Sequence, residues 1–167
     1  MLQSYIVALL VFGSLMSFIS MASEINISGT IIATACVVDA SSLEVDLGDV
    51  TTAELFSAGT GSQWKDFILK IKDCPVSFNN RTVYAYIHGM ADPDSPSFFI
   101  NNGTASNVSI ELTTSGGISL TPSGQTYSRN IVNQEAPLPM RARMVTKKGG
   151  VMPGSVKAAV LVSFRYN

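Results

Sequence analysis

Few residues of this 167-residue chain have both the type and the spacing that catalysis or ligand binding requires. The chain has two cysteines, Cys36 and Cys74, which fit either one disulfide or part of a metal site. His88 is the only histidine, and two distant thiols with one imidazole make a poor ligand set for a metal. No arrangement of nucleophile, base and acid is implied around His88, so we interpret it as a histidine at a strand end. The sequence therefore predicts no enzyme, no metal and no cofactor.

Two other candidate sites have plainer interpretations. Asp92-Pro93-Asp94 resembles a fragment of a calcium loop, but the glycine and the glutamate of such loops are missing, so we expect a turn. Trp64, the only tryptophan, is a candidate for stacking on a sugar ring, with packing in a loop or in the core as the alternative.

The N-terminus indicates export. Residues 1–22 carry no charged side chain and include the apolar run 5–12, and Ser20-Met21-Ala22 places small residues where a signal peptidase cleaves. We expect a signal peptide over 1–22 and no stable membrane insertion after its removal. Because no Lys or Arg precedes the apolar run, retention as an uncleaved anchor is the alternative. Export places Cys36 and Cys74 in an oxidising compartment, where one disulfide is the favoured use of the pair.

The charge of the chain excludes one large class of partners. About 145 residues remain after cleavage, enough for one domain with its own core. The formal net charge is −1, and Lys plus Arg number only 11. A near-neutral chain of this kind lacks the basic surface that nucleic-acid binding requires. We therefore expect one exported domain with no nucleic-acid partner.

Alternating apolar residues recur between turn-forming residues through the rest of the chain. A period of two is typical of a half-buried strand, and Gly, Pro, Asn and Asp mark the turns between strands. Strands are expected at 23–33, 43–47, 65–72, 82–88, 107–113, 127–132 and 138–145. A weak helical turn is expected at 51–57. Several short strands with regular turns predict an all-β sandwich.

The C-terminal residues 156–166 have the most regular strand pattern. Every second residue is apolar: Val156, Ala158, Val160, Val162, Phe164 and Tyr166. A strand this regular is expected to have a neighbour on both sides, yet one residue remains after Tyr166. The pattern predicts a sandwich that lacks its final strand and is completed by another molecule.

The segment 23–35 precedes Cys36, the first residue that a disulfide would tie to the core. It can therefore be a strand that leaves its own domain. One face of the segment carries Ile25, Ile27, Gly29 and Ile31. An apolar strand edge beside 156–166 is costly in water, and an extended strand from another molecule can cover it by β-augmentation. Gly29 allows the donor backbone to approach closely. The alternative is that 23–35 is the first strand of a self-contained sandwich.

On these residues the chain resembles the chaperone–usher pilus subunits of the type 1 fimbrial family, and in particular the small G-type adaptor of the pilus tip. The resemblance covers essentially all of the chain after residue 22. Its most specific element is Gly154 together with the penultimate Tyr166, which form the chaperone-recognition motif of the family. The other matching segments are 29–36, 45–50, 55–64, 73–76, 102–105, 110–112 and the block from Arg141.

The resemblance implies an incomplete immunoglobulin-like β-sandwich at 36–167, with one disulfide and without its final strand. It implies that a periplasmic chaperone lends a strand to the exposed groove and holds the carboxylate of Asn167. At the outer-membrane usher, the donor segment of a neighbouring pilus subunit replaces that strand, while 23–35 of this chain fills another subunit's groove. The implied acceptor and chaperone-recognition residues are Gly154, Val156, Val160, Val162, Phe164, Tyr166 and Asn167.

The expected function is that of a structural fimbrial subunit, exported through the periplasm to the cell-surface fimbrium, where it supports adhesion. The blocks around Trp64 and Arg141 favour a minor tip adaptor over a major rod subunit, and a tip adhesin could be one of its neighbours. The alternative is an exported, self-contained sandwich that binds a carbohydrate or a host surface.

Overall fold

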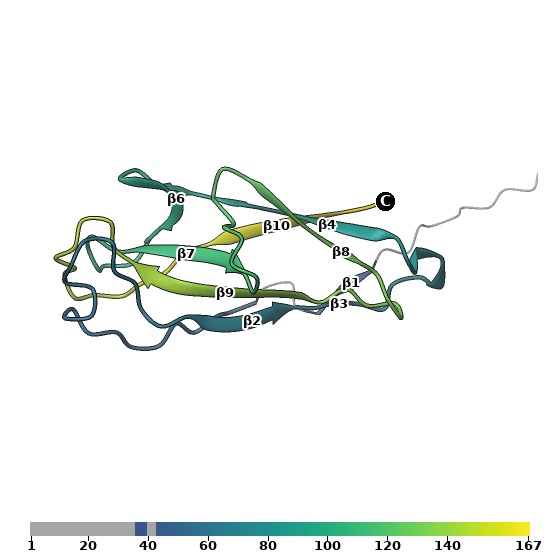
Figure 1. Ribbon diagram of the computed structural model, residues 1–167, viewed down its shortest axis with the longest axis horizontal. Helices are drawn as coiled ribbons and strands as arrows, with labels where there is room; N and C mark the ends of the chain where they lie inside the picture. Colours follow the sequence, from purple (N-terminus) through teal and green to yellow (C-terminus); the bar gives the residue numbers. More distant parts are fainter. Residues whose placement is uncertain (1–35, 40–42) are drawn as a thin grey trace, which may run out of the picture. The chain divides into compact units, whose positions relative to one another are not determined.

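Two antiparallel β-sheets contribute to one apolar core in the computed structural model of this chain (Figure 1). The structure describes residues 36–39 and 43–167. The expected signal peptide, 1–22, and donor segment, 23–35, lie outside the described residues. Within the described part there is no α-helix, and no helix is long and apolar enough to cross a membrane. The expected all-β sandwich is confirmed.

The larger sheet has five strands, and their alternation places one face in the core. Its order is β2 (Lys65–Leu69), β9 (Leu138–Val145), β7 (Ser109–Thr114), β6 (Ser95–Ile100) and β5 (Ala91–Asp92). In β9, Leu138, Met140 and Ala142 are buried, whereas Arg141 and Arg143 lie on the other face. Side chains of successive strand residues point to opposite faces, so this sequence buries one face only.

The smaller sheet carries the C-terminal strand. Its order is β10 (Val160–Tyr166), β4 (Thr82–Gly89) and β8 (Gln125–Asn130). In the central strand β4, Val83, Ala85 and Ile87 are all almost completely buried. Two short elements complete the described structure: the pair β1 (Val37–Val38) with β3 (Ile71–Lys72), and the 3-10 helix η1 (Val76–Phe78).

The core consists of two clusters of buried side chains that share neighbours. The larger cluster lies between the two sheets, and the smaller one is formed by Leu55, Val108 and Met144. Leu47 and Val156 are partly buried and pack against both clusters. These two residues therefore link the packing of the two parts of the core.

One disulfide ties the start of the described chain to this core. Cys36 and Cys74 are joined with an S–S distance of 2.08 Å, as expected from the sequence. Closing a loop of this length stabilises a fold by about 4 kcal/mol on the chain-entropy model. Beside it, Lys72 forms an ion pair with Asp39. The hydrogen bond and the charge of the Lys72 ammonium hold the pKa of Asp39 below its ordinary value.

Several expected strand limits were wrong. Residues 43–47 form no strand, because no described strand lies alongside to bond with them. The expected strand 65–72 is divided at Lys70, since β2 pairs with β9 and β3 pairs with β1. The strand expected at 127–132 lies instead at 125–130, as β8. The strand at 95–100 was not expected, because its first residues, Ser95 and Pro96, are of types that favour turns.

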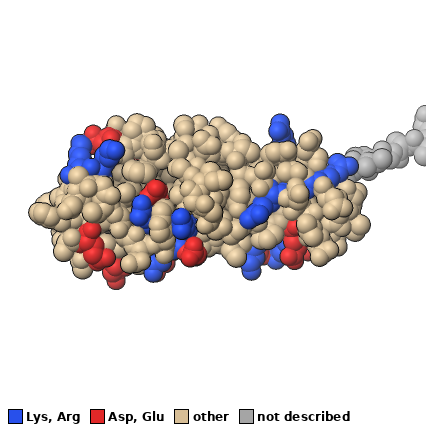
Figure 2. Space-filling model, in the orientation of Figure 1, with Lys and Arg blue, Asp and Glu red and all other residues tan. Residues whose placement is uncertain are grey.

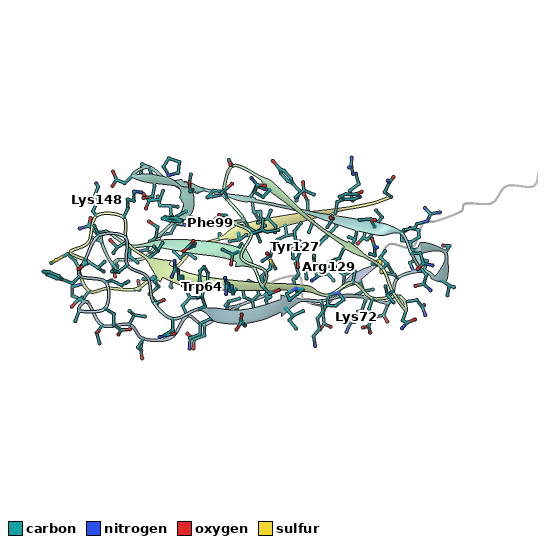
Figure 3. The ribbon with its side chains drawn as sticks, viewed as in Figure 1. Trp64, Lys72, Phe99, Tyr127, Arg129 and Lys148 are labelled. Atoms are coloured by element: carbon teal, nitrogen blue, oxygen red, sulfur yellow. A yellow bond between two sulfur atoms is a disulfide. The ribbon has the colours of Figure 1, made fainter. Side chains whose placement is uncertain are left out.

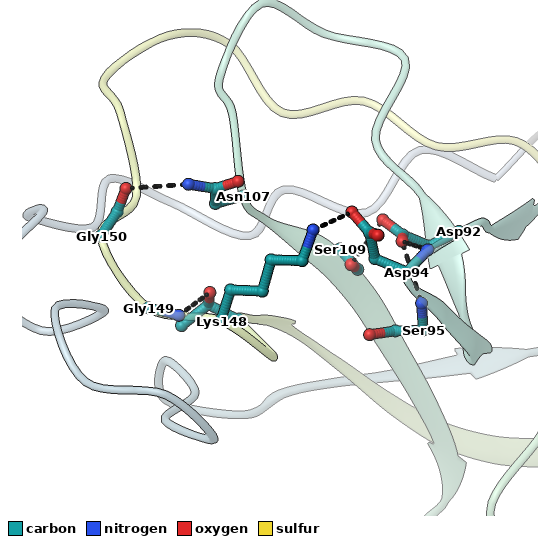
Figure 4. A network of polar contacts seen from close by, with 9 residues as sticks. Asp92, Asp94, Ser95, Asn107, Ser109, Lys148, Gly149 and Gly150 are labelled. Carbon is teal, nitrogen blue, oxygen red and sulfur yellow. Dashed lines mark hydrogen bonds and ion pairs between the residues drawn. The ribbon is translucent and has the colours of Figure 1, made fainter.

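Of the two turns expected from the sequence, the one at 92–94 is present, whereas the helical turn expected at 51–57 is a shorter turn that is not part of a helix. Residues 52–55 form a turn in which the Glu54 carboxylate accepts hydrogen bonds from the amide and the hydroxyl of Thr51. In the other turn, Asp92 Oδ1 accepts from the amides of Asp94 and Ser95 at 2.8 and 3.1 Å (Figure 4). The carboxylate of Asp94 faces Lys148 at 2.7 Å. The Asp92–Asp94 segment is therefore a turn between β5 and β6.

Candidate functional site

Strand β10 is paired on one side only. It runs antiparallel to β4, from Val160 opposite Gly89 to Tyr166 opposite Val83. In Figure 1 it lies beside β4 and leads to the C-terminus. No strand within 36–39 and 43–167 pairs with its other side. The strand expected at 156–166 begins only at Val160, since residues 156–159 do not pair with β4.

The hydrogen-bond pattern shows which main-chain groups β10 directs away from β4. The amide of Asn167 donates to the carbonyl of Thr82 at 3.1 Å, so these two residues face each other through hydrogen bonds. In an antiparallel pair such residues alternate with residues that direct both groups to the opposite side. The amide of Gly89, opposite Val160, accordingly donates away from β10, to Pro122 at 3.2 Å. By this alternation, the residues that face the unpaired side are Val160, Val162, Phe164 and Tyr166.

The same residues direct their side chains toward the core without being fully covered. Val162, Phe164 and Tyr166 are partly buried and pack against the larger cluster. Val160 is 36% exposed, whereas Ala85 and Ile87 in the neighbouring strand are 0% and 1% exposed. The edge of β10 thus combines unpaired main-chain groups with incompletely buried apolar side chains. Both features are costly in water and both are satisfied by one added strand.

The C-terminal end of this edge is aromatic. The ring of Tyr166 lies 5.7 Å from the ring of Phe78 in η1, measured between centroids, and the Arg81 guanidinium lies over Phe78 at 5.3 Å. Partial burial raises the pKa of Tyr166 above its ordinary value of 10.0, because the phenolate is less well solvated there. Phe78 was not foreseen from the sequence, since no local pattern indicates that η1 reaches β10.

The other end of the edge is held by a loop. Ser155 and Lys157 form hydrogen bonds with loop 101–105 through main-chain and side-chain groups. A side chain at Gly154 would overlap the amide nitrogen of Ala105, so glycine is needed there for close approach. Val156, in the same segment, is partly buried against both core clusters. The involvement of loop 101–105 was missed, because its partners lie about fifty residues away in the sequence.

The remaining candidate residues lie elsewhere. The donor residues Ile25, Ile27, Gly29 and Ile31 fall outside the described residues. Trp64 lies near β9 (Figure 3), where the guanidinium groups of Arg141 and Arg143 are 4.5 and 4.3 Å from its ring centroid. These contacts agree with the interpretation of Trp64 as a residue that packs within the protein, the alternative to stacking on a sugar ring. Positive and negative side chains are interspersed on the face in Figure 2, much of which is uncharged.

The raised pKa of Tyr166 gives a pH dependence that reports on this edge. The neutral phenol contributes its full stability below the unfolded-state pKa, and that contribution is lost as pH rises through the raised folded-state pKa. We expect the free energy of unfolding to fall more steeply above about pH 10 for the wild type than for Tyr166→Phe. Urea denaturation at a series of alkaline pH values measures both slopes. Equal slopes would contradict the burial of Tyr166.

Comparisons with known proteins agree with this geometry. The family model described as "Fimbrial protein" matches residues 25–167. Protein FimG of Escherichia coli K12 is 33% identical over 144 residues, covering 86% of this chain and 84% of FimG. The S-fimbrial adhesin protein SfaS of E. coli O6:K15:H31 is 29% identical over 145 residues, covering 86% and 85%.

Solved structures show the same fold. The P pilus rod subunit PapA superposes with a TM-score of 0.68 at 16% identity, covering 80% of this chain and all of PapA. A chain of a chaperone–usher pilus superposes with a TM-score of 0.66 at 17% identity, covering 90% of this chain and 99% of the other. With the family model matching nearly all of the sequence, this chain belongs to the fimbrial protein family.

Proposed function

We propose that this chain is a minor tip adaptor of a chaperone–usher pilus, a structural subunit polymerised by donor-strand exchange. Membership of the fimbrial family makes a structural pilus subunit the general function. The similarity to FimG supports the more specific role of adaptor. The observation that carries the exchange mechanism is the edge of β10. The residues there whose main-chain groups have no partner are also the ones whose apolar side chains are only partly buried.

The mechanism follows from what that edge needs. A periplasmic chaperone covers the edge first with a strand of its own, and its basic residues hold the carboxylate of Asn167. The amide of Asn167 bonds to Thr82, which fixes the terminus beside β4. At the outer-membrane usher, a donor segment from a neighbouring subunit replaces the chaperone strand. Gly154 and Tyr166, at the two ends of the acceptor segment, are the proposed recognition residues.

The donor of this chain is the segment 23–35, which follows a signal peptide at 1–22 and precedes the pilin domain at 36–167. Its Ile25, Ile27 and Ile31 enter the acceptor edge of a neighbouring subunit. Burying three isoleucines at about 1.5–3 kcal/mol each contributes roughly 5–9 kcal/mol before main-chain pairing is included. With one donor and one acceptor on each chain, the contacts are head-to-tail and extend into a fibre.

Thermal unfolding of two oxidised versions of the domain tests this function. One version spans residues 36–167, and the other adds residues 23–35 after Asn167 through a short flexible linker. We expect only the extended version to unfold cooperatively at high temperature, because the added strand pairs with β10 and covers its apolar side chains. The control is a version in which the residues of the added segment 23–35 are joined in scrambled order. If residues 36–167 alone unfold cooperatively and the added strand changes nothing, the sandwich is self-contained and the proposal is wrong.

Donor and acceptor variants are expected to fail at different stages. In Ile27→Asp/Ile31→Asp, the charges cannot enter a neighbour's core, so donation stops while the chaperone complex still forms. Removing Tyr166 and Asn167 takes away the chaperone's anchor, so the chain no longer accumulates in the periplasm. Co-purification with the chaperone and the yield of assembled fibres measure the two stages. Loss of chaperone binding in the donor variant, or normal accumulation of the truncated chain, would contradict the assignment of roles.

A further inference from the structure

The main-chain pattern of β10 continues beyond its first residue. On the side of β4, the hydrogen bonds of the strand are made by every second residue, ending with Asn167. Residues 155 and 157 keep this alternation, but their partner is loop 101–105 in place of β4. The carbonyls of Lys157 and Ser155 accept from the amides of Asn102 at 2.7 Å and Ala105 at 3.0 Å.

Side chains supply the other half of this attachment. Asn101 Oδ1 accepts from the amide of Lys157 at 2.8 Å, and Thr104 Oγ1 accepts from the amide of Ser155 at 2.8 Å. Asn101 also braces its own loop, because Oδ1 accepts from Gly103 at 2.8 Å and Nδ2 donates to Ala105 at 2.9 Å. We call the contacts between 101–105 and 154–157 the clasp.

The clasp leaves one side of residues 156–158 unpaired. Among the described residues, no hydrogen bond reaches the main chain of Val156 or Ala158. These residues have the same parity as Val160 and Val162, whose main-chain groups face the unpaired side of β10. Val156 also packs partly buried against both core clusters. The edge whose main-chain groups lack hydrogen-bond partners therefore runs from 156 to 166, which is four residues longer than β10.

From this arrangement we propose that Asn101, through the clasp, determines how long a donor strand the domain accepts. This inference rests on the proposed function of donor-strand exchange. Loop 101–105 replaces β4 as the bonding partner and holds 154–157 in place before any donor arrives. A donor that reaches Val156 then gains main-chain pairing without bearing the cost of ordering this segment. Without the clasp, only the edge at 160–166 remains ordered.

Peptides of different length test the inference. The probes are a synthetic peptide of residues 23–35 and two shortened peptides, 23–31 and 27–35. The protein is the chain after signal cleavage, with Ile27→Asp/Ile31→Asp throughout so that its own donor segment does not compete. One of the two shortened peptides lacks the end that would pair with residues 156–158. We expect this peptide to bind about tenfold more weakly than the full peptide, because each hydrogen bond lost costs about 1 kcal/mol.

Asn101→Ala is expected to remove this advantage selectively. Asn101→Ala should bind the full peptide about tenfold more weakly than the unchanged protein does. Its affinity for the shortened peptide that does not reach residues 156–158 should be unchanged, so that it binds both peptides equally. Asn101→Asp keeps the acceptor for Lys157 and should retain most of the length preference. Asn130→Ala, which loses a bond from Thr82 at 3.0 Å on the opposite edge of the sheet, is the matched control. An equal loss for all three peptides in Asn101→Ala, or no loss, would overturn the inference.

Amide hydrogen exchange provides a readout that needs no donor. In the free chain, the amides of Ser155 and Lys157 should be protected, and those of Val156 and Ala158 should exchange rapidly. Equal rates at all four positions would overturn the inference even if the peptides bind. Conversely, a wild-type chain that binds none of the peptides but shows the alternating protection contradicts donor-strand exchange and leaves the clasp supported.

Discussion

The rest of this structure depends on one constraint, namely that a sheet edge must pair its main-chain groups and cover its apolar face. β10 satisfies neither condition among the described residues. The register with β4 fixes the parity, so that Val162, Phe164 and Tyr166 direct their main-chain groups toward the unpaired side and their side chains toward the core. A strand that meets one need therefore meets the other, and this coincidence favours an extended strand over a globular partner.

The elements around the edge maintain this state in different ways. The buried face of β4 anchors the paired side of β10 in the core, and the disulfide between Cys36 and Cys74 ties the start of the described chain to that core. Phe78 supports Tyr166 at one end of the edge, and the clasp holds Val156 at the other. Gly154 illustrates how one residue can serve two requirements. Its lack of a side chain is required by the contact with Ala105, whatever its role in chaperone recognition.

Much of this architecture could be predicted because it follows from period-two alternation. The strands at 82–89 and 138–145 were found almost to the residue, since one face of each is buried. Residues 43–47 show the same alternation but form no strand, because pairing depends on a neighbour that a local pattern does not reveal. The clasp was beyond prediction for a related reason. Asn101 and Lys157 meet through a side-chain bond that no periodic signal encodes.

Amide hydrogen exchange along β10 tests the central claim most directly. It compares residues 36–167 alone with the version that carries 23–35 after Asn167. The account predicts that Ser163 and Arg165, which face β4, are protected in both versions. Val162, Phe164 and Tyr166 should be protected only when the added strand is present. Protection of all five residues in the domain alone would show that the edge already has a partner, and it would contradict the account.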